Sequence, residues 1–137
     1  MRIDEIHAGD VAELAKTVTE SDIALFAGVT GDFNAVHIDA EAAKKSVFGE
    51  RIAHGMLSAG FISAVLGMRL PGSGSIYLSQ TLRFTKPVRI GDTVTARVEV
   101  LEVLTAKRRV RLATSCRNQN GEVVVDGEAV VMLDHRE

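Results

Sequence analysis

The chain has 137 residues, which suits one domain over residues 1–137 and is short for two. Hydrophobic residues make up 46% and charged residues 25%, and the formal net charge of −2 gives no electrostatic reason to expect a nucleic-acid partner. The acidic N-terminal stretch lacks the apolar core of a signal peptide, and no apolar run reaches the ~18 residues of a membrane span. The single Cys116 fits a reducing compartment. We therefore expect a cytoplasmic protein without a membrane partner.

The first half of the chain has the periodicity of helices. Residues 19–31 begin with the cap-type residue Thr19, continue with helical spacing and end at Gly31. Residues 39–49 suggest a short helix that is capped by Asp39 and closed by a glycine.

The most apolar stretch runs from His54 to Leu70. No charged residue occurs between Gly55 and Met68, and Pro71 ends the segment. A helix that is apolar nearly all round must be buried. We therefore expect a long central helix that is surrounded by protein.

The second half of the chain alternates between apolar and polar residues, as strands do. The alternating segments are residues 75–84, 93–100, 109–119 and 122–133. The phase slips at Leu101, which suggests a bulge, and Asn120-Gly121 is a hairpin signal. Residues 10–19 could add an edge strand. This order favours an α+β fold in which an antiparallel sheet wraps around the central helix.

The stretch "GDFNAVHID", residues 31–39, places two polar groups close together. Asp32 and His37 are five residues apart, so on one helix they would point about 140° apart. They can converge only if the segment is a loop, and Gly31 and Asn34 favour irregular backbone. The alternative is a surface loop whose polar groups bond to its own backbone. The spacing leaves both interpretations open.

A carboxylate beside an imidazole suits the chemistry of water. Imidazole titrates near pH ~6.5, and a carboxylate can orient the ring, bind a water or hold a proton. Two such groups around one water can activate it and return a proton elsewhere. This chemistry fits hydration or dehydration of a double bond.

The start of the apolar helix is a second candidate site. Free N–H groups lie at a helix N-terminus, and Gly55 lets a carbonyl oxygen approach them. His54 and Gly55 could instead only cap and turn into a buried helix. Ser63 could contact the water of Asp32 and His37, or be a buried serine that bonds the carbonyl four residues earlier. No third ligand stands at a zinc-like spacing, so we expect no metal.

The chain resembles the (R)-specific enoyl-CoA hydratases of the MaoC-like family, which have the hot-dog fold. Residues 31–39 resemble the family's D-x-N-P-x-H motif. Residues 48–67, "FGERIAHGMLSAGFISAVLG", resemble the block that leads into the central helix, and residues 71–94 resemble the following strand and turn. The similarity runs from about Ile23 to Leu133.

The resemblance implies syn addition of water to a trans-2-enoyl-CoA, which gives an (R)-3-hydroxyacyl-CoA. Asp32 and His37 match the catalytic pair that activates the water and delivers a proton to C2. Gly55 matches the glycine whose N–H polarises the thioester carbonyl. Ser63 matches a serine near the water, and Asn34 matches the asparagine that supports the loop.

The resemblance also implies a homodimer and no cofactor beyond the CoA of the substrate. Leu66 and Val131 match positions that line the acyl pocket, and they suggest short acyl chains of roughly four to six carbons. Ala35 replaces the motif proline, which would fix φ. We expect a looser loop at this position but not a loss of activity.

Two other functions remain as alternatives. A hot-dog acyl-CoA thioesterase could also use Asp32 to activate water, because fold does not fix function. A non-catalytic acyl-CoA-binding module would not need a competent pair. The sequence does not identify the pathway, which could be fatty-acid metabolism or polyhydroxyalkanoate precursor supply. It also does not identify the site that binds the CoA phosphates, for which Arg83, Lys86 and Arg89 are candidates.

Overall fold

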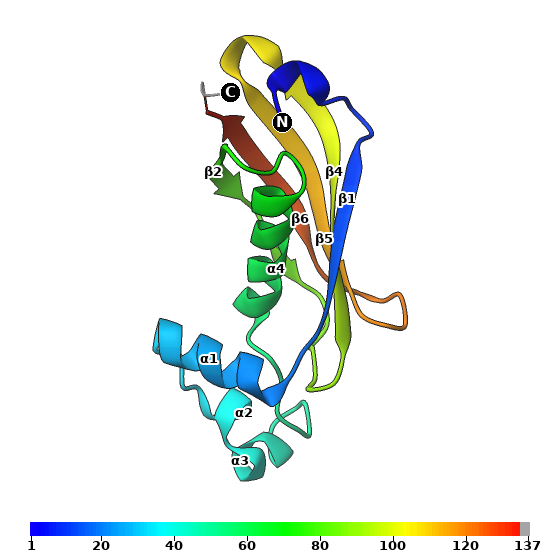
Figure 1. Ribbon diagram of the computed structural model, residues 1–137. Coiled ribbons are helices and arrows are strands. Elements are labelled where there is room, and N and C mark those ends of the chain that lie inside the picture. The colour runs from blue at the N-terminus through cyan, green and yellow to red at the C-terminus, as the bar shows by residue number, and fades with distance from the viewer. Residues whose placement is uncertain (135–137) are drawn as a thin grey trace.

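A six-stranded antiparallel sheet with one long helix along a face forms the body of the molecule (Figure 1). The computed structural model describes residues 1–134, so His135 and the two residues after it lie outside the described residues. The elements in chain order are η1 (Ile3–Glu5), β1 (Val11–Thr17), α1 (Glu20–Thr30), α2 (Ala35–Ile38), α3 (Ala40–Lys44), α4 (Gly55–Met68), β2 (Ser75–Gln80), β3 (Arg83–Phe84), β4 (Thr93–Leu104), η2 (Thr105–Lys107), β5 (Arg109–Arg117) and β6 (Val123–Leu133). The expected α+β architecture is confirmed.

The sheet has the order β1-β4-β5-β6-β2, and the short β3 also pairs with β6. Strand β1 is the expected edge strand, since within residues 1–134 it pairs only with β4. The register of β4 against β5 shifts between Val100 and Glu102, which confirms the bulge expected at Leu101. Gly121 has a φ of 76° in the β5–β6 connection, so the hairpin expected at Asn120-Gly121 is also confirmed.

Helix α4 is buried on one side only. Ile62, Val65 and Leu66 are at most 2% exposed and belong to the core that the sheet and helix share. On the other side, Met56 is 54% exposed and Met68 is 74% exposed. The expectation of a helix buried all round is therefore wrong for the single chain, because the sheet covers only one face of the helix. No helix within residues 1–134 has the length and apolar character to cross a bilayer.

The single cysteine belongs to this core. Cys116 is fully buried, and its thiol donates a hydrogen bond to the carbonyl of Ser58 over 3.4 Å. Burial raises the pKa of the Cys116 thiol to about 12, because the thiolate would lose its hydration. A thiolate nucleophile at this position is therefore excluded at neutral pH.

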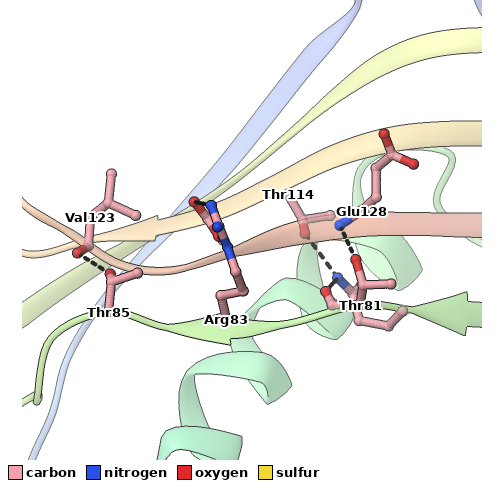
Figure 2. A network of polar contacts seen from close by, with 8 residues as sticks. Thr81, Arg83, Thr85, Thr114, Val123 and Glu128 are labelled. Carbon is pink, nitrogen blue, oxygen red and sulfur yellow. Dashed lines mark hydrogen bonds and ion pairs between the residues drawn. The ribbon is translucent and has the colours of Figure 1, made fainter.

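The segment expected as one strand, residues 75–84, is two short strands. At the break, the Thr81 N–H donates to the Glu128 carbonyl over 2.9 Å, and the Thr81 hydroxyl accepts from the Glu128 N–H over 3.0 Å (Figure 2). The Thr81 carbonyl also approaches Gly127 closely: a Cβ on Gly127 would lie 1.8 Å from it. This close contact is possible only because β6 carries a glycine, and it lies at the break between β2 and β3.

The short helices gather at the N-terminal end of α4 (Figure 1). Asp39 caps α3 as expected, since its Oδ1 accepts from the N–H groups of Glu41 and Ala42. The helix ends at Lys44, so the expectation of a helix that reaches Gly49 is wrong. Gly49 instead closes a turn with a φ of 73°.

The connection between α1 and α2 is held by a chain of short-range hydrogen bonds. Gly31 ends α1 with a φ of 82°. The Asp32 N–H then donates to the Thr30 hydroxyl over 3.1 Å, and the Asn34 N–H donates to the Asp32 carboxylate over 3.1 Å. Asn34 caps α2 through its Oδ1, which accepts from the Val36 N–H over 3.3 Å. The loop is thus defined without the motif proline.

Ala35 lies where a proline fits. It is the first residue of α2, and the N–H group at this position has no partner within its own helix. The preceding Asn34 has φ −52° and ψ 130°, the extended conformation that a residue before proline requires.

We therefore expect the Ala35→Pro variant to be more stable than the wild type. A proline at a compatible position reduces the entropy of the unfolded chain, which should raise the free energy of unfolding by about 0.4–1 kcal/mol. Urea denaturation of both proteins measures this difference. Val36→Pro is the matched control: it removes an N–H that bonds Asn34 and should destabilise the protein. A destabilised Ala35→Pro variant would contradict the account of the loop.

Candidate functional site

Asp32 lies just before α2, at the open end of the α1–α2 connection. One oxygen of its carboxylate accepts the Asn34 N–H described above, and its backbone carbonyl accepts a hydrogen bond from a ring nitrogen of His54 over 3.0 Å. The residue is exposed in the single chain. Asp32 therefore has a fixed backbone and a carboxylate that solvent or a ligand can reach.

His37 lies on the one-turn helix α2 and is only 8% exposed. Its Nδ1 is 2.8 Å from the carbonyl oxygen of Ile52. Because a carbonyl only accepts hydrogen bonds, we infer that Nδ1 carries the proton and that Nε2 has the free lone pair. The His37 carbonyl accepts from Arg51 Nε over 2.8 Å, and Arg51 also pairs with Glu20 of α1. These contacts tie α2 to its neighbours on both sides.

His54 is the residue that sequence reasoning did not place at this site. It is 2% exposed, and its ring stacks on that of His37 with 3.9 Å between centroids. It occupies the position before α4, but its side chain makes no capping hydrogen bond. The interpretation of His54 as a helix cap is therefore right for its position in the chain but does not account for its side chain. The only signal in the sequence was a histidine beside the candidate Gly55.

The three side chains converge. Asp32, His37 and His54 each place a carboxylate oxygen or ring nitrogen within 4.8 Å of the other two. Two acceptors bridged by one water stand about 4.6 Å apart, given hydrogen bonds of about 2.8 Å. The Asp32 and His37 groups can therefore share one water. The same three groups could also hold a metal ion, and the expectation of no metal remains a prediction.

Gly55 opens α4 directly after His54. The first N–H groups of a helix have no intrahelical partner, so the Gly55 N–H is free to bind an oxygen. A Cβ at this position would lie 2.6 Å from a ring carbon of Phe84. Only glycine leaves room for both the Phe84 ring and a ligand here.

A pocket of about 470 Å³ is lined by His37, His54 and Gly55, whereas Asp32 is not among its lining residues. It lies between the start of α4 and the segment after β3. Its lining residues are His37, Phe48, Ile52, Ala53, His54, Gly55, Met56, Ser58, Phe84, Thr85, Lys86, Pro87, Val88 and Val125. The wall is mainly apolar with a few polar groups, as is typical of sites for small molecules.

Three of the expected site residues do not line this pocket. Ser63 is exposed on the open side of α4, about 12 Å along the helix axis from Gly55, so the interpretation of a buried serine is wrong. It lines a second groove, of about 460 Å³, with Met56 and residues of β2. Leu66 and Val131 are 2% and 1% exposed and lie in the core. Their roles at the water and in the acyl pocket remain predictions.

The candidate cations for CoA phosphates all have carboxylate partners. Arg83 pairs with Asp126 over 3.2 Å, and Arg89 pairs with Glu50 over 3.3 Å. Lys86, which lines the pocket, pairs with Glu122. A phosphate at any of these residues would have to compete with a carboxylate.

Several known proteins are similar to this chain in sequence and in fold. The (R)-specific enoyl-CoA hydratase of Rhodospirillum rubrum is 55% identical over 133 residues, 97% of this chain and 92% of that protein. The R-hydratase PhaJ1 from Pseudomonas aeruginosa, in its unliganded form, superposes with a TM-score of 0.93 at 51% identity, covering 98% of this chain and 86% of that one. The (R)-hydratase of Aeromonas caviae involved in PHA biosynthesis gives 0.90 at 44% identity, with 93% and 97% covered.

These likenesses confirm the hot-dog fold that the sequence implied, with its central helix against the sheet. The MaoC-like domain matches residues 5–124, which is most of the chain. With a family match of this length and relatives of this identity, the chain belongs to the MaoC-like domain family.

Proposed function

We propose that the protein is an (R)-specific enoyl-CoA hydratase. The observation that carries the proposal is the hydrogen bond from His37 Nδ1 to the Ile52 carbonyl, because it leaves Nε2 as a base on a ring that has a nitrogen within 4.8 Å of the Asp32 carboxylate. The Gly55 N–H lies at the same pocket. The family relatives, which are named as R-hydratases, support the same reaction.

The pair can carry the water chemistry with its protons in balance. A water held between Asp32 and His37 transfers one proton to the pair while its oxygen forms a bond to C3 of the enoyl group. The electrons of the C2–C3 double bond move toward the thioester carbonyl and give an enolate. The pair then returns the proton to C2 from the same side. The product carries OH on C3 and H on C2, so the addition is syn.

The enolate oxygen needs a donor that is already in place. The Gly55 N–H at the positive end of the α4 dipole can supply this hydrogen bond. The substrate's CoA is the only cofactor-like group that this reaction requires. We also propose that the enzyme is cytoplasmic, because a lone thiol such as Cys116 stays reduced in that compartment.

The proposal includes a homodimer. Strand β2 lies at one edge of the sheet, and its apolar residues Ile76, Tyr77 and Leu78 are each 41–42% exposed. The open side of α4 lies beside this strand and forms a groove with it. A second copy that covers both surfaces would bury an apolar face that a single chain leaves in water.

Substitution of either member of the pair should remove most of the turnover. We expect Asp32→Asn and His37→Gln each to lower kcat on crotonyl-CoA by about 10²–10⁴-fold, the usual contribution of a general acid or base. The loss of enoyl thioester absorbance measures the rate. The control is His7→Gln, because His7 is exposed and lies near the N-terminus, thirty positions before His37.

Near-normal rates in both variants would contradict the proposed roles. Release of free thiol from saturated acyl-CoA by the wild type would favour a thioesterase. Tight acyl-CoA binding without any turnover would favour a binding module.

Gly55→Ala should lower kcat on crotonyl-CoA by at least about 10-fold. The added Cβ would meet the Phe84 ring at 2.6 Å, so the ring or the first turn of α4 would have to shift next to the free N–H. The control is Gly28→Ala on α1, where a Cβ meets nothing within 4 Å. Equal activity of the two alanine variants would contradict the requirement for a glycine at the start of α4.

Light scattering should give a mass twice the 14.7 kDa of one chain. Leu78→Glu places a charge on the exposed apolar edge strand, and we expect it to shift the protein toward the monomer. Lys107→Glu, in the β4–β5 connection, is a control that should remain dimeric. A wild-type protein that is monomeric at micromolar concentration would contradict the homodimer.

A further inference from the structure

The imidazole of His54 is buried in a way that stability alone does not explain. Its Nδ1 is inaccessible to solvent and has no hydrogen-bond partner among the described residues. An unsatisfied buried nitrogen is destabilising, and an apolar ring of the same shape would avoid that cost. The ring also does not cap α4. A histidine at this position therefore needs another reason.

The first reason is its contact with Asp32. The Nε2 of His54 donates to the Asp32 backbone carbonyl over 3.0 Å, which assigns the proton of the neutral ring to Nε2. The Asp32 N–H is held by the Thr30 hydroxyl, and the carboxylate is held by the Asn34 N–H. Of these three bonds, only the His54 bond comes from a residue outside the continuous segment 30–34.

The second reason is its contact with His37. The hydrogen bond from His37 Nδ1 to the Ile52 carbonyl fixes one point of that ring but leaves rotation about the bond. The stacked ring of His54, 3.9 Å away and inclined by 27°, limits this rotation. Phe26 supports the His54 ring from α1, with 4.8 Å between centroids.

The third link is covalent. His54 precedes Gly55, so the backbone that carries the imidazole also carries the N–H at the start of α4. One residue therefore connects the carboxylate, the imidazole and the carbonyl-binding N–H. We propose that His54 is a positioning residue that holds Asp32 and His37 in register with the Gly55 N–H. This inference rests on the hydratase function proposed above.

Three substitutions of His54 separate the donor from the ring. Phe keeps the stacked ring but loses the donor. Gln places an amide nitrogen near the position of Nε2, whereas Asn places one near Nδ1. Since a displacement of about 1 Å can cost up to 10²-fold in rate, we expect His54→Phe to lower kcat by about 10–10²-fold with little change in KM. His54→Gln should recover part of the loss, and His54→Asn should not.

A spectroscopic readout tests the same inference without turnover. Nitrogen-15 NMR of the histidine side chains should show the Nδ1–H tautomer for His37 and the Nε2–H tautomer for His54 in the wild type. In His54→Phe, the His37 Nδ1–H should exchange with solvent faster, because its ring is less restrained. Circular dichroism and thermal unfolding establish that each variant is folded.

The outcomes distinguish the two proposals. If the wild type fails to hydrate any enoyl-CoA, the proposed function is wrong, and the NMR result still decides the positioning role. If the wild type is active and folded His54→Phe has a kcat within about twofold of it, His54 does not position the pair. Equal activities of the Gln and Asn variants, or the opposite tautomer at His54, would also overturn the inference.

Discussion

The carbonyl oxygen of Ile52 accepts a hydrogen bond from His37 over 2.8 Å, and the site depends on the backbone around it. The Ile52 N–H donates to the Val36 carbonyl, and the Ala53 N–H donates to the Val88 carbonyl over 2.7 Å. This short extended segment is thus held between α2 and the turn before β4. It sets the tautomer of His37, places the His54 ring and fixes where α4 begins.

The hydrogen bonds from this segment explain how the short loop that carries Asp32 can hold a fixed position. Residues 31–34 are all exposed in the single chain, so we infer that groups outside the loop help to hold their position. Arg51 bonds the His37 carbonyl from one side, and His54 bonds the Asp32 carbonyl from the other. Both residues come from the segment that leads into α4. The position of the loop therefore depends on the segment that leads into α4. Ala35, the first residue of α2, stands where the motif proline would be, and these hydrogen bonds are present without that proline.

Much of the fold could be predicted from sequence because period and turn chemistry are local properties. The edge strand, the bulge near Leu101 and the hairpin at Gly121 all follow from local pattern. The break between β2 and β3 could not be predicted in this way. It depends on the close approach of Thr81 to Gly127, which lies more than forty residues away in the chain.

The candidate site shows the same limit. The convergence of Asp32 and His37 could be expected, because the two residues do not share one helix. The segment is a loop only as far as Asn34, however, and His37 lies on the one-turn helix α2. The stacking of His54 on His37 could not be expected, since the two are seventeen positions apart and meet only through tertiary packing. Likewise, the open side of α4 is as apolar in sequence as the buried side, so composition does not reveal that the sheet covers only one of them.

The most direct measurement is the stereochemistry of hydration in deuterium oxide. If Asp32 and His37 act on one water and return the proton from the same side, crotonyl-CoA should give (R)-3-hydroxybutyryl-CoA with deuterium at C2 on the face that received the hydroxyl. Chiral analysis of C3 and proton NMR coupling constants at C2 determine both centres. An S product would contradict the proposed R-specificity, and deuterium on the opposite face would contradict a single pair acting from one side of the substrate.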